Sequence, residues 1–391
     1  VLAFCSSQTQ TRWLTALAAV IGLSANFSYY QSVMPLVASL VVIAAQTWVW
    51  VFVVGATRRV VVDRQRWWTV FAYPVFWVAL DTLMAAFLPD GNWASLAYSQ
   101  SEFLAALQIT SVFGVAGLLF LVTLVPSALA LAVTYRRDVK NSALACAVTA
   151  LLVMASMGYG VLRLQNPTTG NEVTFGLVAI DNFIGPDATA FYMEQVWQQY
   201  DQYVTALADQ GAHIIILPEK IAVLSPPQAD LLKQHLSSLA LKNHVWLEVG
   251  VGLDDGGRRL NLLWLFSSDG ALSANYQKHY MAPLEREYLP GHDYEVRSID
   301  GIRYGLAICK DMHFAALGRA YGERHVAVML VSAWDFKVDA WMGARMTVVR
   351  GVENGYSVVR SSREGLLGIS DAYGRILVEQ ESAAIPGRTL F

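Results

Sequence analysis

The stretch His213-Ile-Ile-Ile-Leu-Pro-Glu219 places a glutamate directly behind four consecutive apolar residues. A run this short and apolar, closed by proline, is typical of a buried strand that ends where the chain turns. In α/β domains the ends of such strands border the clefts that bind ligands. Because a carboxylate in this position must be paired or face a cavity, Glu219 is a candidate functional residue.

Two other residues occur in similar positions farther along the chain. Lys278 lies in Tyr276-Gln-Lys-His-Tyr280, and Cys309 lies between Gly305-Leu-Ala-Ile308 and Lys310-Asp311. A carboxylate, an ammonium and a thiol brought together can run acyl transfer through a thioester, with the carboxylate moving the proton and the ammonium stabilising the oxyanion. We expect Lys278, Lys310 and a helix starting near Phe314 to favour the thiolate.

Each of these residues also has an ordinary interpretation. An isolated cysteine behind an apolar strand is commonly an inert core residue, and a lysine at a strand end is commonly solvated. A glutamate there can cap a helix or lie on the surface. Cys5 and Cys146 fall in the first half of the chain, so Cys309 is the only thiol of the second half. In an oxidising compartment it would have no disulfide partner there and must be buried or reactive.

Strands and helices alternate throughout the second half of the chain. This alternation predicts an α/β domain whose sheet faces are covered by helices. Strands are expected at 173–180, 213–217, 245–253, 260–267, 304–308, 326–332, 356–361, 365–370 and 375–379, and helices at 188–210, 228–242, from about 314, and at 340–354.

Charged residues are scarce in the first half of the chain. The protein has 391 residues, of which 55% are hydrophobic and 15% charged, whereas soluble domains carry about 25% charged residues. From Arg12 to Arg163 the charges occur only in tight clusters. This contrast predicts a transmembrane helical domain over 1–165 followed by a soluble domain over 166–391. A net charge of −3 gives no reason to expect nucleic acid as a partner.

About five apolar segments approach or reach the length that crosses a bilayer. The loops 57–68 and 135–140 are rich in Arg and Lys, and the loops 29–31 and 89–103 contain neither. Because positively charged loops stay in the cytoplasm, the fifth span leads to the outer side, and the second domain is expected to be extracytoplasmic. The predicted spans are 13–28, 33–56, 69–88, 104–134 and 142–162.

Several further motifs accompany the three candidate residues, and the order Glu, Lys, Cys resembles the catalytic triad of the nitrilase superfamily. With an apolar half in front, the chain resembles its membrane-integral branch, the bacterial apolipoprotein N-acyltransferase family. Residues 95–100 resemble that family's Gly-Tyr-Ser-Gln segment, and 113–121 its next transmembrane helix. The other matching motifs are Leu217-Pro218-Glu219, Tyr276-Gln277-Lys278-His279 with Pro283 downstream, 305–309, Arg345, Arg350, Glu353 and 358–361.

This resemblance implies a transmembrane α-helical bundle followed by a nitrilase-like α-β-β-α sandwich. It implies that Cys309 takes an acyl group from a phospholipid and passes it to the N-terminal amine of a diacylglyceryl-cysteine lipoprotein. Glu219 would act as general base and acid and Lys278 would stabilise the oxyanion. Glu287 would be the family's second glutamate, with Glu285 as the competitor for that role. The implied location is the bacterial inner membrane, with the catalytic domain on the periplasmic side. No cofactor or metal is expected.

The chain also departs from the family's pattern. Lys310 and Asp311 stand where the family has an aromatic residue and Glu, Lys220 replaces a small hydroxyl residue, and 332–336 rearranges the family's Ser-Asn-Asp-Ala-Trp-Phe. The family's first two spans and its last are absent, and because the chain begins with Val we expect trimmed ends. These departures leave open a membrane-anchored amidase that hydrolyses a carbon–nitrogen bond, and a catalytically silent scaffold or sensor.

Overall fold

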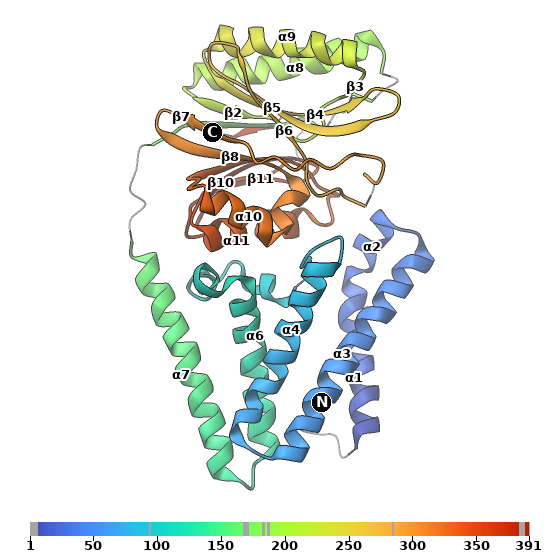
Figure 1. The fold of residues 1–391 in the computed structure, drawn as a ribbon, viewed down its shortest axis with the longest axis vertical. Coiled ribbons are helices and arrows are strands. Elements are labelled where there is room, and N and C mark those ends of the chain that lie inside the picture. The colour runs from blue at the N-terminus through green and yellow to red at the C-terminus, as the bar shows by residue number, and fades with distance from the viewer. Residues whose placement is uncertain are drawn as a thin grey trace. The chain divides into compact units, whose positions relative to one another are not determined.

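The computed structural model describes residues 7–93, 95–166, 172–181, 184–185, 188–283, 285–382 and 388–390. The chain divides into two compact units, Val1–Gln165 and Asn166–Phe391 (Figure 1). The described part of the first unit is helical, and the second unit contains two sheets with helices. Cys5 lies outside the described residues.

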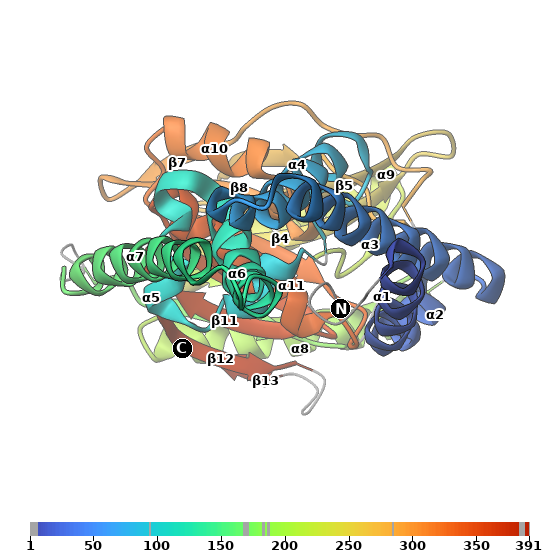
Figure 2. The same ribbon diagram turned by 90° about the horizontal axis from the view of Figure 1, so that it is seen from below.

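The first unit is built from helices that pack side by side. α1 packs against α3, and α6 packs against both α4 and α7; Figure 2 shows these helices end-on. The helices are α1 (Gln8–Leu23), α2 (Phe27–Val33), α3 (Leu36–Arg64), α4 (Ala72–Phe87), α5 (Leu104–Leu107), α6 (Thr110–Thr134) and α7 (Val139–Leu164), with 3₁₀ segments at Ser24–Asn26, Trp67–Phe71 and Leu96–Gln100.

Four helical stretches among the described residues are long and apolar enough to cross a membrane: α3, Trp67–Phe87, α6 and α7. They confirm four of the five predicted spans. The first predicted span is not among them, because α1 has 16 residues and rises about 24 Å, less than the roughly 30 Å of a bilayer core. The span predicted over 104–134 begins instead at Thr110, because Leu104–Leu107 form a separate short helix. Gly114, with a φ of 65°, kinks α6 inside this span.

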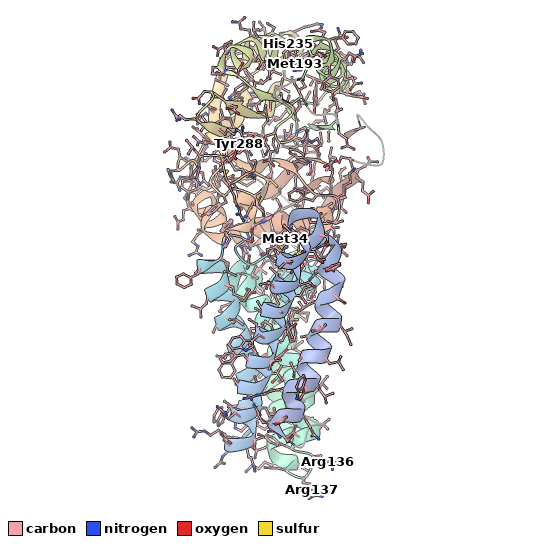
Figure 3. The ribbon with its side chains drawn as sticks, turned by 90° about the vertical axis from the view of Figure 1, so that its right-hand side faces the viewer. Met34, Arg136, Arg137, Met193, His235 and Tyr288 are labelled. Carbon is pink, nitrogen blue, oxygen red and sulfur yellow. The ribbon has the colours of Figure 1, made fainter. Side chains whose placement is uncertain are left out.

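The two loops rich in positive charge lie at the same end of the first unit. The backbone N–H of Trp67 donates to Oδ1 of Asn141 at 2.9 Å, and the hydroxyl of Tyr135 donates to the carbonyl of Val61 at 2.8 Å. Figure 3 shows Arg136 and Arg137 at this end. The two loops therefore face the same side, which the alternation of spans requires.

The second unit contains two mixed sheets with parallel centres. β1, β2 and β4 are parallel in the first sheet, as are β8, β9 and β10 in the second. The strand orders are β13-β1-β2-β4-β5-β6, with β3 paired to β4, and β12-β11-β10-β9-β8-β7. The strands are β1 (Phe175–Ala179), β2 (Ile214–Ile216), β3 (Val223–Leu224), β4 (Trp246–Asp254), β5 (Arg259–Phe266), β6 (Leu272–Gln277), β7 (Val296–Ile299), β8 (Ile302–Ile308), β9 (Val328–Trp334), β10 (Ser357–Arg363), β11 (Leu366–Ser370), β12 (Ile376–Glu381) and β13 (Arg388–Leu390).

The sheets stack face to face, and helices cover both outer faces (Figure 1). α8 and α9 cover the first sheet, and α10 and α11 cover the second. Leu177 and Leu263 of the first sheet pack against Leu306, Leu330 and Val359 of the second in a shared core. This arrangement confirms the predicted α-β-β-α sandwich. The helices are α8 (Ala190–Asp209), α9 (Pro226–Asn243), α10 (Ala315–Glu323) and α11 (Ala340–Asn354).

Local sequence explains most of these elements. Ser225 and Gln228 form a capping box at the start of α9, with proline in its first turn. α11 ends at Gly355, whose φ of 77° is the left-handed conformation that favours glycine. A strand end was expected at Lys278, but no bounds were predicted for the strand that precedes it, β6. It is an edge strand with intermittent burial, so it lacks the apolar run that marks a buried strand.

A glycine on β4 makes room for the loop that carries Glu219. A Cβ atom at Gly250 would lie 2.6 Å from both the Cα of Glu219 and the carbonyl oxygen of Pro218. The backbone N–H of Ile221 donates to the carbonyl of Gly250 at 2.9 Å, which fixes the loop against the strand. Any side chain at this position would therefore push the loop away from β4.

We predict that Gly250→Ala destabilises the second unit by about 1–3 kcal/mol, because the added methyl group meets backbone atoms that cannot move aside. The unfolding temperature should fall by several degrees in a thermal melt. Gly257→Ala is the control, since a Cβ atom there meets nothing within 4 Å. Equal melting temperatures for the two variants would contradict the close approach.

Candidate active site

The structure brings Glu219 and Lys278 into direct contact. Glu219 lies three residues beyond Ile216, the last residue of β2, and Lys278 follows β6 directly. The Nζ atom of Lys278 lies 2.8 Å from Oε1 of Glu219, and the two side chains are 1% and 2% exposed. The sequence placed both residues at strand ends, and the sheet order brings those ends together.

Cys309 joins this pair through the end of β9. The thiol of Cys309 lies 3.6 Å from the carbonyl oxygen of Trp334, and the backbone N–H of Glu219 donates to the carbonyl of Ala333 at 3.2 Å. The two residues therefore contact consecutive peptide groups of one strand. Cys309 starts a short 3₁₀ helix with a φ of 44°, a left-handed conformation that non-glycine residues seldom adopt and that is often found at functional sites.

The second glutamate of the cluster is Glu285. Its Oε2 atom lies 2.6 Å from Nζ of Lys278, and its side chain is 4% exposed. Glu287 instead forms an ion pair with Arg259 and is 75% exposed. The prediction that Glu287 lies beside Lys278 is therefore wrong. A turn that begins at Ala282, whose N–H donates to Oε2 of Glu285 at 2.9 Å, folds Glu285 inward and leaves Glu287 facing outward.

Two further residues of the cluster were not among the sequence candidates. The amide nitrogen of Asn261 donates to Glu219 at 2.6 Å and to Glu285 at 2.7 Å, so it links the two carboxylates. Lys220 forms a buried ion pair with Glu285. A polar residue inside the apolar strand Arg259–Phe266 was the available signal for Asn261. Lys220 stood out in the sequence only as a departure from the family pattern.

Asp311 connects the Cys309 turn to the Lys278 turn. Its Oδ1 atom accepts hydrogen bonds from the backbone N–H groups of His279 and Tyr280 at 3.0 and 2.9 Å. Its Oδ2 atom accepts from the hydroxyl of Tyr276 at 2.7 Å and from the N–H of Ile308 at 3.0 Å. Four hydrogen bonds to one buried carboxylate fix the positions of both turns relative to each other.

Oppositely charged neighbours in the cluster stabilise the ionised forms of Lys278 and Glu285. Burial acts to lower the pKa of Lys278, but the Glu219 and Glu285 carboxylates outweigh it and hold that pKa well above its ordinary value. Burial alone would raise the pKa of Glu285, but Lys278 and Lys220 reverse the shift and lower it. Lys278 therefore remains an ammonium and Glu285 a carboxylate at neutral pH.

The thiol is held in its neutral form. Burial and the neighbouring Glu219 carboxylate raise the pKa of Cys309, and Lys278 opposes the shift without cancelling it. Lys310 donates to the carbonyl of Met281 at 2.9 Å, and α10 begins six residues after the cysteine. Lys278 favours the thiolate as expected, but burial and the Glu219 carboxylate outweigh it, so the resting thiol stays protonated. A base must take the proton during reaction.

A buried glutamic acid supports the loop beneath Glu219. Burial raises the pKa of Glu248 on β4 to about 8. The hydroxyl of Ser332 lies 2.7 Å from the carbonyl oxygen of Leu217 and 3.0 Å from Oε1 of Glu248, but it has one proton to give. A protonated Glu248 resolves this, because it donates to Ser332, which then donates to Leu217.

The chain was compared with known protein families. Residues 182–381 match the model of the carbon-nitrogen hydrolase family. The chain belongs to that family. Residues 1–129 match the model of the N-terminal domain of apolipoprotein N-acyltransferase, which places the chain in the membrane-integral branch that its sequence resembles.

Curated relatives fall into two groups. The apolipoprotein N-acyltransferase of Geobacter metallireducens is 24% identical over 340 residues, which cover 78% of this chain and 65% of that protein. That of Rickettsia prowazekii is 22% identical over 338 residues, 78% of this chain and 66% of the relative. The human omega-amidase is 29% identical over 142 residues, 31% of this chain and 51% of that protein. The chain thus spans about two thirds of the acyltransferases it matches.

A solved structure is also similar to the second unit. It is an amidase from Nesterenkonia sp. that is 18% identical in sequence. The alignment covers 57% of this chain and 91% of the amidase chain, and its TM-score is 0.48.

We predict that Glu248→Gln becomes more stable relative to the wild type as the pH rises from 5 to 8. A carboxyl group whose pKa is higher in the folded state binds a proton more tightly there. The free energy of unfolding of the wild type therefore falls as the pH rises from the unfolded-state pKa of this group to its folded-state pKa. The glutamine avoids this loss, which amounts to roughly 1 kcal/mol per pH unit. Thermal melts across this pH range test it; a constant difference between the two proteins would contradict it.

Proposed function

We propose that this protein transfers an acyl chain from a phospholipid to the N-terminal amine of a diacylglyceryl-cysteine lipoprotein, through a thioester on Cys309. The observation that carries the proposal is the buried Glu219–Lys278–Glu285 cluster beside a thiol, in a chain whose first 129 residues match an acyltransferase domain. A carboxylate, an ammonium and a thiol are the groups that thioester chemistry needs.

In the first step, Glu219 takes the proton of Cys309 while the sulfur attacks the carbonyl carbon of a phospholipid ester. A carbon–sulfur bond forms, and the carbonyl electron pair moves to oxygen, where the ammonium of Lys278 stabilises the negative charge. The carbon–oxygen bond then breaks, and the departing alkoxide takes the proton from Glu219. A lysophospholipid leaves and the acyl chain stays on sulfur.

In the second step, the amine of the lipoprotein attacks the thioester carbonyl carbon. Glu219 takes a proton from the amine, Lys278 again stabilises the oxyanion, and the carbon–sulfur bond breaks. The proton passes from Glu219 to the sulfur, which restores the thiol of Cys309. Glu285 takes the role that the sequence assigned to Glu287, because it is the carboxylate that keeps Lys278 charged.

Both substrates are lipids, so the proposed reaction takes place at a membrane. Within the part of the chain that the structure describes, four helical stretches are long and apolar enough to cross one. With the two positively charged loops on the cytoplasmic side, the chain leaves α7 on the outer side, so we propose a bacterial inner-membrane protein with a periplasmic catalytic unit.

An amidase is the second candidate, favoured by the match to the human omega-amidase over 142 residues. In that reaction the thiol attacks an amide and water releases the acyl group. The two candidates share the first covalent intermediate and differ in what removes the acyl chain from it.

Incubation with phospholipid and a diacylated lipopeptide is expected to add the mass of one acyl chain to the peptide. Cys309→Ser should remove this activity, because an alcohol is a far weaker nucleophile at this position. Cys146→Ser is the control, since it changes the thiol in α7 and leaves the cluster intact. Release of fatty acid with no gain on the peptide would favour hydrolysis, and full activity in Cys309→Ser would exclude Cys309 as the nucleophile.

Incubation with phospholipid alone should leave an acyl group on Cys309, visible in the intact mass. We predict that Glu219→Gln slows formation of this adduct by about 10²–10⁴-fold, because the thiol then has no base. The measurement is the rate of mass gain under single-turnover conditions. An unchanged rate would remove Glu219 from the mechanism.

A further inference from the structure

Lys220 is a second buried lysine in the site, and the proposed mechanism gives it no task. Its side chain is 9% exposed and forms an ion pair with Glu285. The ring centroids of Tyr288 and Trp334 lie 5.0 and 5.3 Å from its Nζ atom. Lysine is seldom buried, because its ammonium loses hydration that only a carboxylate or an aromatic face can replace. Here both are provided.

The backbone is arranged to bring this side chain into the cluster. Glu219 and Lys220 lie in a turn that follows β2. Lys220 has a φ of 47°, in the left-handed region. The Nζ atom of Lys220 donates to Oε1 of Glu285, and the Nζ atom of Lys278 donates to Oε2 of the same carboxylate. A strained conformation kept at a candidate active site indicates that the contact matters.

The contacts of Glu285 show what Lys220 changes. Oε1 of Glu285 accepts from Lys220 and Asn261, and Oε2 accepts from Lys278 and the N–H of Ala282. Without Lys220, one ammonium would serve two buried carboxylates, and the cluster would carry a net charge of −1. With Lys220, two ammonium groups balance two carboxylates. Every negative charge that forms later, on sulfur or on the oxyanion, then develops in a neutral site.

We propose that Lys220 is a positioning residue that neutralises Glu285 and so leaves the charge of Lys278 available to Cys309 and the oxyanion. The inference rests on the proposed function, because it concerns the ionisation of the same thiol. It acts through Glu285 and Lys278, since the described contacts of Lys220 are with Glu285 and two aromatic rings. An opposite charge within a few ångströms favours an ionised group, and an uncompensated like charge opposes it.

The test is the rate at which iodoacetamide alkylates Cys309 in the full chain, followed by peptide mass at pH 7 and 8.5. Lys220→Met makes the cluster more negative and should slow the reaction. Glu285→Gln makes it more positive and should speed it. The double variant restores neutrality and should return close to the wild-type rate. If the pKa of the Cys309 thiol changes by one unit, the alkylation rate is expected to change about three- to tenfold. The change is less than the full tenfold when a higher pKa makes the remaining thiolate more nucleophilic.

Two controls separate charge from structure. Lys220→Arg keeps the charge and should recover most of the rate lost in Lys220→Met. Lys233→Met removes a more exposed lysine on α9, which is also paired with a carboxylate, Asp230, and lies 5.0 Å from the ring of Trp264. It should leave the rate unchanged.

The inference is wrong if Lys220→Met and Lys220→Arg slow alkylation equally, or if the double variant is slower than both single variants. If Lys220→Met fails to fold, the comparison of Glu285→Gln with the double variant still decides, because adding Lys220→Met must reverse the gain. Failure of the wild-type protein to gain an acyl group on Cys309 during incubation with phospholipid would instead overturn the proposed function itself.

Discussion

A buried ammonium between two carboxylates is the interaction on which the rest of the site depends. Lys278 lies 2.8 Å from Glu219 and 2.6 Å from Glu285, and none of the three side chains is more than 4% exposed. Removing one partner of such a group leaves an uncompensated charge in a medium of low dielectric constant, at a cost of about 3–5 kcal/mol. Each loop that carries one of these residues can therefore keep its buried conformation only while the others keep theirs.

The surrounding framework serves the same constraint. Asp311 holds the turns after β6 and β8 together through four hydrogen bonds, and the end of β9 supplies the carbonyl groups that Glu219 and Cys309 contact. The loop before Glu219 is supported by Ser332, which lies within hydrogen-bonding distance of the Leu217 carbonyl. The two sheets thus act as a rigid support, and the charged side chains at their edge are held by groups from both.

The same geometry suits both a transferase and an amidase. Both chemistries need a thiol, a base beside it and a cation for the oxyanion. They differ in whether an amine or water reaches the thioester.

The sequence by itself determined the elements whose signals are local. α11 was predicted over 340–354 and is observed at Ala340–Asn354, because helical spacing and the following glycine both belong to the segment. Four spans followed from apolar length, and the buried strands β1, β2 and β8 followed from short apolar runs. Glu219, Lys278 and Cys309 were singled out because they stand at strand ends.

The tertiary structure decided which polar side chains join them. Glu285 and Glu287 are two residues apart in one loop, and a turn at Ala282 alone determines which faces Lys278. Asn261 is a single polar residue in an apolar strand, and its purpose is visible only when two carboxylates from other loops lie opposite it. Local patterns report which residues are buried, but the pairing of buried charges depends on contacts between segments far apart in the chain.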